Sequence, residues 1–177
     1  MAQREVAPVS EGEAPFVAVD PATSFEAFFE AETETLFRRL CLVTGDRAEA
    51  EEIAQDAFLK VWERWDRVAE VDDKVGYLYR VAMNVFRNRY RRSKLALRKT
   101  RDPEFGSDEF GAAEVRSGVS RGLAKLTSRQ RAAIVLVDLL GYGSEEAGRM
   151  LGIRAGTVRT LVIRARKTLR EELEENA

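Results

Sequence analysis

The chain has no histidine and a single cysteine, Cys41, among its 177 residues. An internal disulfide is therefore impossible, and a lone thiol is typical of proteins from a reducing cytoplasm. Zinc sites and catalytic triads that depend on histidine are excluded, because the usual nitrogen ligand and general base are missing. The acids Glu51, Glu52 and Asp56 cluster, but no nucleophile or metal set accompanies them. We predict no cofactor, no metal and no enzymatic activity.

Long apolar runs are missing as well. No stretch approaches the length that spans a membrane, and residues 1–15 lack the apolar core of a signal peptide. We therefore expect a cytoplasmic protein without membrane insertion. Only four prolines and a charged share of 33% favour helices. The sequence predicts an all-α fold.

The net charge of −1 hides a separation of acids from bases. From Arg80 to Arg101 the charged side chains are all basic, and the aromatic residues Tyr77, Tyr79, Phe86 and Tyr90 lie at the start of this stretch or within it. Basic groups with interleaved rings are typical of surfaces that bind single-stranded nucleic acid. The alternative is that Phe86 and at least one tyrosine belong to the core while the arginines only aid solubility.

Helical periodicity divides the N-terminal part into three helices. Residues 1–22 lack periodicity and indicate a disordered tail. Thr23 and Glu26 have the spacing of a capping box ahead of the first helix. The second helix, about 47–65, has an apolar stripe that ends in Trp62 and Trp65. A loop over 66–74, with Asp72 as cap, precedes the third helix, about 73–92.

An acidic, glycine- and serine-containing stretch, 101–120, separates the two halves and is typical of a flexible linker. It divides the chain into two small helical domains, 23–100 and 121–177. The linker could also shield a basic surface. The second domain begins with Thr127 and Gln130 at capping-box spacing, ahead of a helix that runs to Gly141.

Residues 144–170 contain two apolar-periodic runs separated by Gly152, the pattern of a helix-turn-helix. The second run carries no acid between Ile153 and Arg170, so its polar face is basic and suits the major groove. An ordinary helical hairpin with a basic face is the alternative.

Two stretches together resemble the extracytoplasmic-function (ECF) sigma factors of bacterial RNA polymerase. GDRAEAEEIAQDAFLKVWERW and GYLYRVAMNVFRNRYRRS are similar to sigma region 2, and LTSRQRAAIVLVDLLGYGSEEAGRMLGIRAGTVRTLVIRARKTLREEL is similar to region 4. The resemblance implies a promoter-specificity subunit whose partners are core RNA polymerase and promoter DNA. The resemblance is also compatible with an anti-sigma factor as a further partner.

The resemblance assigns three surfaces. The polymerase-docking face is Glu52, Gln55, Asp56, Leu59 and Lys60. The surface for the single-stranded −10 element is Tyr77, Arg80, Asn84, Arg87, Asn88, Arg91 and Arg92, and loop 66–74 receives a flipped base. The reader of the duplex −35 element is Arg154, Thr157, Arg159, Thr160, Arg164, Arg166 and Lys167. The linker corresponds to the segment that threads toward the polymerase active site and the RNA exit path.

The sequence departs from the family pattern at several of these positions. Gly148, together with Ser144 and Ala147, predicts a loosely packed first helix of the motif. Leu161 and Ile163 are expected to remove a phosphate contact and to add exposed apolar surface. In region 2, Tyr77 replaces the usual tryptophan and Asn88 the usual acid.

Two other functions compete with the sigma factor. A helix-turn-helix regulator with an N-terminal dimerisation domain would bind specific duplex DNA without polymerase. A degenerate sigma-like module would titrate a partner protein and would support no transcription.

Overall fold

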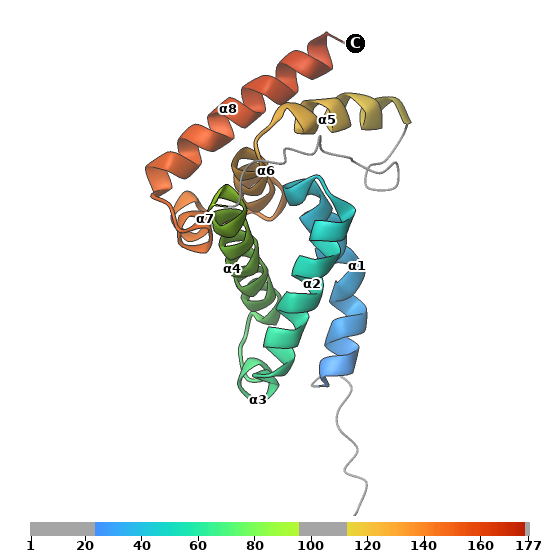
Figure 1. Cartoon of the computed structure of the whole chain (residues 1–177), viewed down its shortest axis with the longest axis vertical. Helices are drawn as coiled ribbons and strands as arrows, with labels where there is room; N and C mark the ends of the chain where they lie inside the picture. Colours follow the sequence, from blue (N-terminus) through green and yellow to red (C-terminus); the bar gives the residue numbers. More distant parts are fainter. Residues whose placement is uncertain (1–23, 96–112, 176–177) are drawn as a thin grey trace, which may run out of the picture.

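The computed structural model describes residues 24–95 and 113–175, and these are helical without any strand (Figure 1). The all-α prediction is confirmed. The first half consists of α1 (Phe25–Thr44), α2 (Arg47–Trp62), α3 (Trp65–Val68) and α4 (Lys74–Leu95). The second half consists of α5 (Ala113–Lys125), α6 (Ser128–Ile134), the π-helical segment η3 (Val135–Leu139), α7 (Ser144–Leu151) and α8 (Ala155–Glu174). The predicted tail, 1–22, lies outside the described residues.

Capping side chains explain where α1, α2 and α4 begin. Asp46 caps α2, and its Oδ1 accepts a hydrogen bond from the Glu49 N–H at 3.1 Å. The cap of α1 is Ser24, whereas the predicted Thr23 lies outside the described residues. The cap of α4 is Asp73, which accepts from the Gly76 N–H at 2.7 Å, and the predicted Asp72 was one residue off.

Three boundaries differ from the sequence prediction. α2 ends at Trp62, and the predicted loop 66–74 begins inside α3. Trp62 does not complete the buried stripe, since 56% of its surface is exposed. The linker predicted over 101–120 extends too far, because α5 is helical from Ala113; the rest of it, up to residue 112, lies outside the described residues.

The second half contains the predicted helix-turn-helix. The capping box of Thr127 and Gln130 is present at the start of α6. Gly152 ends α7 with φ +64°, a left-handed conformation that favours glycine, and α8 begins three residues later. Val158, Val162 and Ala165 of α8 are buried. The apolar stripe of α8 therefore attaches it to the rest of the half.

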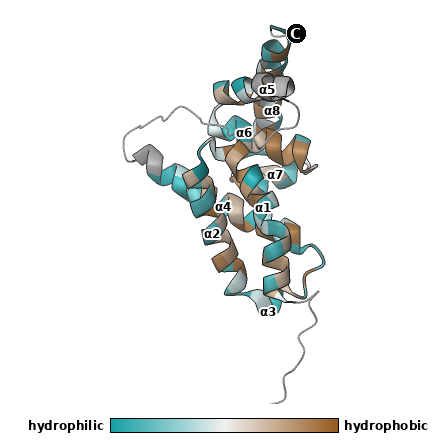
Figure 2. Cartoon of the chain, turned by 90° about the vertical axis from the view of Figure 1, so that its right-hand side faces the viewer, coloured by the Kyte–Doolittle hydropathy of each residue, from teal (hydrophilic) through white to brown (hydrophobic). Residues whose placement is uncertain are grey.

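One apolar core crosses both halves. Leu36, Leu40 and Val43 of α1 belong to the same buried cluster as Ala133 and Leu136 of the second half. α6 packs on α1, and α7 packs on α4 (Figure 1). In the side view the apolar residues of α6 and α7 lie at this junction (Figure 2). The two helical domains are therefore in direct contact along the core.

Gly148 makes a close helix crossing possible, which overturns the expectation of loose packing. A Cβ atom at this position would lie 2.7 Å from the Ile153 carbonyl oxygen and 3.3 Å from the Ala155 nitrogen. Its neighbours Ala147, Met150 and Leu151 are buried. Backbone atoms cannot move aside as a flexible side chain can, so glycine is required where α7 meets the start of α8.

We expect Gly148→Ala to lower the free energy of unfolding by about 1–3 kcal/mol, because the added methyl group forces the turn apart. Gly156→Ala is the matched control. An added Cβ at Gly156 meets only the Arg159 guanidinium, at 3.8 Å. That substitution should raise helix propensity and stabilise the chain by up to about 1 kcal/mol. Urea unfolding measures both, and equal stabilisation by the two alanines would contradict the close crossing.

Candidate polymerase and nucleic-acid interfaces

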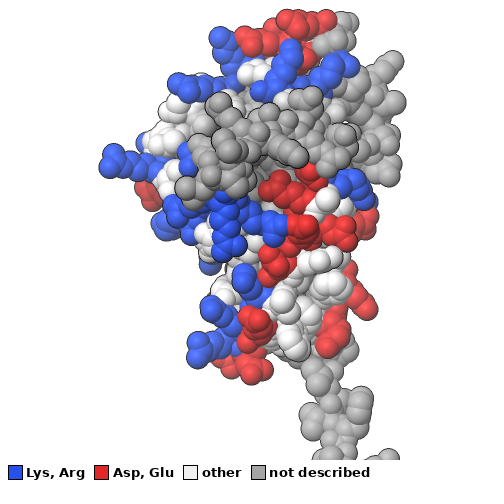
Figure 3. Space-filling model, in the orientation of Figure 1, with Lys and Arg blue, Asp and Glu red and all other residues white. Residues whose placement is uncertain are grey.

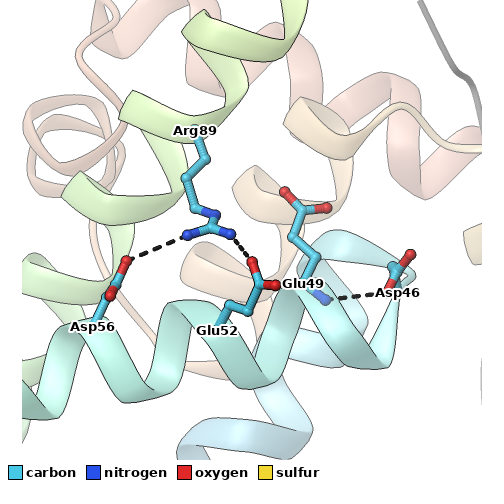
Figure 4. Close-up of polar contacts among 5 residues, drawn as sticks. All are labelled: Asp46, Glu49, Glu52, Asp56 and Arg89. Atoms are coloured by element: carbon cyan, nitrogen blue, oxygen red, sulfur yellow. Dashed lines mark hydrogen bonds and ion pairs between the residues drawn. The ribbon is translucent and has the colours of Figure 1, made fainter.

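The outer face of α2 carries the five predicted docking residues, and the structure places all of them at the surface. Glu52, Gln55, Leu59 and Lys60 are exposed, and Asp56 is half-buried. Arg89 of α4 reaches this face, where it pairs with Glu52 and with Asp56, the latter at 3.3 Å (Figure 4). Two of the docking carboxylates are therefore partly neutralised by the first half itself.

An apolar groove continues the docking face toward α1. Phe29, Leu59 and Trp62 line it with 40%, 53% and 56% of their surfaces exposed, and Phe25 and Phe58 also line it. The rings of Phe29 and Phe58 are 4.8 Å apart in an edge-to-face arrangement. Sequence reasoning found Leu59 but missed the exposure of Trp62, because it placed Trp62 on the apolar stripe of its helix.

On the face shown in Figure 3, many of the acidic and basic side chains gather in separate groups. Acids gather along α2 and α1, and bases gather over α4 and toward α7 (Figure 3). Glu26 and Glu30 of α1 border the apolar groove. The net charge is therefore near zero although acidic and basic side chains gather in separate groups on this face.

Most of the predicted strand-binding residues of α4 are exposed, and two of them, Tyr77 and Arg87, are half-buried. Asn84, Asn88, Arg91 and Arg92 are exposed. Arg80 pairs with Glu146 of α7 at 2.9 Å, and half-buried Arg87 lies against Gly152. Tyr77 is half-buried against the core.

The aromatic residues near the basic run have different roles. Phe86 is buried, as the sequence analysis allowed, and so is Tyr79. Burial raises the pKa of the Tyr79 hydroxyl, and Arg39, which donates to it at 2.6 Å, acts against that rise. Tyr90 is half-buried beneath the Arg129 guanidinium of α6, 5.4 Å from its ring centre. Tyr79 and Phe86 are therefore core residues.

All seven residues predicted to read duplex DNA are exposed on α8 or just before it: Arg154, Thr157, Arg159, Thr160, Arg164, Arg166 and Lys167. Arg166 differs from the rest, because it donates to both carboxylate oxygens of Asp138 at 2.6 and 3.0 Å. This hydrogen-bonded pair raises the pKa of Arg166. Ile163 is 65% exposed as expected, whereas Leu161 is half-buried against the core, contrary to expectation.

Arg131 of α6 joins the two halves and was not found from sequence. The residue is 3% exposed, and its guanidinium donates to the Val43 and Thr44 carbonyls at the end of α1, at 3.0 and 2.7 Å. It also donates to the Leu126 and Leu123 carbonyls of its own half, at 2.6 and 3.3 Å. Burial lowers the pKa of Arg131 to about 10, so the group stays charged at neutral pH.

Two family models match the chain, one in each half. Sigma-70 region 2 matches residues 28–96, and Sigma-70, region 4 matches residues 118–169. The RNA polymerase sigma-E factor of Streptomyces avermitilis is 30% identical over 152 residues, which cover 85% of this chain and 85% of that protein. The chain is an ECF sigma factor of the sigma-70 family. Members of this family bind core RNA polymerase and promoter DNA and direct transcription initiation.

A second relative agrees with this assignment, and two solved structures share the fold. The ECF RNA polymerase sigma factor SigM of Mycobacterium tuberculosis is 30% identical over 152 residues, 82% of this chain and 75% of that protein. The fold is similar to the sigma factor RpoE in complex with the anti-sigma factor NepR from Bartonella quintana, with a TM-score of 0.66, 21% identity and coverage of 86% and 98%. It is also similar to CnrH in complex with the cytosolic domain of CnrY, with a TM-score of 0.54, 21% identity and coverage of 89% and 94%.

The described part of this ECF sigma factor has no group of acids and cysteines arranged to hold a metal ion. Over the same residues, none of the helices combines the length and the apolar character needed to cross a bilayer.

Arg131→Met should lower the free energy of unfolding by about 3 kcal/mol or more, because it removes the donors and leaves buried carbonyls without partners. Arg121→Met on α5 is the control, since Arg121 is exposed, and it should change stability by less than about 0.5 kcal/mol. Urea unfolding followed by circular dichroism measures both. A loss below about 1 kcal/mol for Arg131→Met would show that the carbonyls find other partners.

Proposed function

We propose that this ECF sigma factor divides promoter recognition between its halves. The first half docks on core polymerase through α2 and holds the unpaired −10 strand on α4. The second half reads the −35 duplex through α8. The observation that supports this division is a basic face on each half, separate from the acidic and apolar face of α2. A bacterial polymerase works on the chromosome, so we place the protein in the cytoplasm.

Holding one strand provides a physical route to promoter opening. A surface that binds only the unpaired strand shifts the equilibrium between duplex and open DNA toward the open form. Arg91 and Arg92 can contact phosphates, while Asn84 and Asn88 can accept and donate hydrogen bonds to base edges. Neither half needs high affinity, because both are carried by one polymerase and their contributions multiply.

The docking face fits an amphipathic partner helix. Leu59, Trp62 and Phe29 form an apolar strip, and the acids Glu26 and Glu30 border it. A helix with an apolar stripe and basic neighbours would bury the strip and neutralise its acidic border. An anti-sigma factor, NepR, is present in the solved complex of RpoE, and we propose that a protein of this class also binds this chain.

A run-off transcription assay with core polymerase tests the function. We expect a transcript from promoters that are found by mapping transcript starts after overexpression of the chain. A failure to bind core polymerase even at low salt would reject the proposal. Specific duplex binding without polymerase would instead favour the regulator, and a stable partner complex without transcription would favour the titrating module.

The double substitution Leu59→Ala/Trp62→Ala should weaken binding to core polymerase about tenfold or more, because two exposed apolar side chains are lost from the centre of the interface. Fluorescence anisotropy of the labelled sigma factor measures the Kd. The matched control is Leu173→Ala, an exposed leucine of α8 on the other half. Equal affinities for the double variant and the wild type would remove the groove from the docking surface.

Arg164→Ala should reduce the slope of log Kd against log salt for a −35 duplex by about one unit, since one phosphate contact is lost from the holoenzyme. Arg166→Ala is the comparison. Asp138 holds Arg166 at the side of α8, so its removal should change the slope by much less. The same slope for both variants would show that the ion pair opens on DNA.

A further inference from the structure

Ile163 is an apolar, exposed side chain in the middle of the basic face of α8. Among the large apolar side chains of the described residues, it has the greatest exposed fraction, 65%. The chain has no acid between Ile153 and Arg170, so the surroundings of Ile163 are cationic. Phosphates attract the arginines of this face but offer an isoleucine nothing, because the side chain has no charge and no hydrogen-bonding group. A favourable contact for Ile163 has to be apolar.

Ile163 lies on the same face of α8 as two residues predicted to read duplex DNA, Arg159 and Thr160. Together with Gly156 these residues have the spacing i, i+3, i+4 and i+7, which places them along one side of a helix. All four are exposed. A recognition helix in the major groove contacts base edges from positions with this spacing. Ile163 is therefore placed to meet a base edge.

The guanidinium groups on either side of Ile163 are engaged elsewhere. Arg159 lies one turn before Ile163 and extends toward the preceding turn, since its Nη2 would lie 3.8 Å from a Cβ at Gly156. Arg166 follows Ile163 by three residues and donates to both carboxylate oxygens of Asp138. The Ile163 side chain therefore remains open to solvent between them.

The major groove presents one apolar group, the 5-methyl group of thymine. Its other features are hydrogen-bond donors and acceptors, which an isoleucine cannot pair. The Thr160 hydroxyl already donates to the Gly156 carbonyl oxygen at 3.0 Å, so its proton is not available to a base. The chemistry of Ile163 therefore selects a thymine methyl group.

A protein partner fits this position less well. A specific protein interface buries hundreds of square ångströms on each side, and the centre of such an interface is depleted of charge. Ile163 is a single apolar side chain with Arg159, Arg164 and Lys167 around it. One methyl group of DNA, flanked by phosphates, matches both the small apolar area and the surrounding positive charge.

We propose that Ile163 is a specificity-determining residue that packs against the 5-methyl group of a thymine in the −35 duplex. The inference rests on the proposed role of α8 as the reader of that duplex. The arginines supply affinity through phosphates, which carry no sequence information. Ile163 supplies discrimination at one base pair, because only thymine carries a methyl group in the major groove.

Replacement of thymine by deoxyuridine tests the contact directly. The probe is a duplex that carries the −35 element of a promoter mapped after overexpression and that ends upstream of the −10 element. Each thymine of both strands is replaced singly by deoxyuridine, which removes the methyl group and keeps every hydrogen-bonding group. We expect holoenzyme with the wild-type chain to bind one of these duplexes about three- to fivefold more weakly, the effect of losing one buried methyl group.

The variant Ile163→Ala should abolish this response. Its holoenzyme should bind the thymine and deoxyuridine duplexes equally, so that the protein and DNA changes are not additive. Leu173→Ala is the matched control, because it truncates an exposed leucine of the same helix, and it should keep the full response. Thr160→Ser removes the other methyl group of this face and keeps a hydroxyl for the Gly156 carbonyl. Loss of the response in Thr160→Ser but not in Ile163→Ala would overturn the role of Ile163.

The salt dependence separates an apolar contact from a phosphate contact. Ile163→Ala should leave the slope of log Kd against log salt unchanged, because an isoleucine releases no counterions. A slope reduced by about one unit, as expected for Arg164→Ala, would show that the substitution disturbs the phosphate contacts of the helix and would overturn the methyl contact.

The outcomes distinguish this inference from the proposed function. If wild-type holoenzyme binds the −35 duplex no better than a scrambled duplex, the proposed role of α8 fails and the inference fails with it. If holoenzyme prefers the −35 duplex but every deoxyuridine replacement is harmless, or the element contains no thymine, α8 remains the reader and only the methyl contact is wrong.

Discussion

The buried guanidinium of Arg131 connects the two halves of this sigma factor. The last carbonyls of α1 have no partner inside their own helix, and they lie at the negative end of its dipole. Arg131 satisfies Val43 and Thr44 there and reaches two carbonyls of its own half with the same planar group. A lysine could not do this, because its three donors radiate from one nitrogen. The position of α6, and with it that of α7 and α8, depends on this group.

Charge in this chain is used in two ways that composition alone does not separate. Some cations form ion pairs with acids of the same chain, as Arg89 does with Glu52 and Asp56 and as the exposed Arg166 does with Asp138. Others, such as Arg91 and Arg164, remain at the surface. Under the proposed function, the cations without an acidic partner release the most counterions when DNA binds, so the number of arginines alone overstates the expected number of DNA contacts.

Sequence patterns predicted most of the helices and the all-α fold class, because helix caps and apolar periodicity are local signals. Asp46 and the pair Thr127 and Gln130 are caps that act over three residues, and Gly152 ends its helix through its own φ angle. Trp62 was misassigned because a stripe of period 3.6 does not reveal where its helix leaves the core. Arg131 could not be found at all, since its partners in α1 lie more than eighty residues away in sequence. The contacts of Arg80 with Glu146 and of Arg87 with Gly152 could not be found for the same reason, since they join residues far apart in sequence. The roles of individual surface residues on α2, α4 and α8 stay predictions.

The close crossing at Gly148 fixes the direction of the long helix α8. α8 has twenty residues, so it extends about 30 Å from that crossing, and a tilt of about 5° there would move its far end by about 2.5 Å. The far end is itself anchored, because buried Glu172 pairs with Lys125 of α5. Because both ends of α8 are fixed, its orientation relative to the rest of the second half is set before DNA binds. The angle at which α8 would enter a DNA groove is therefore not adjusted on contact.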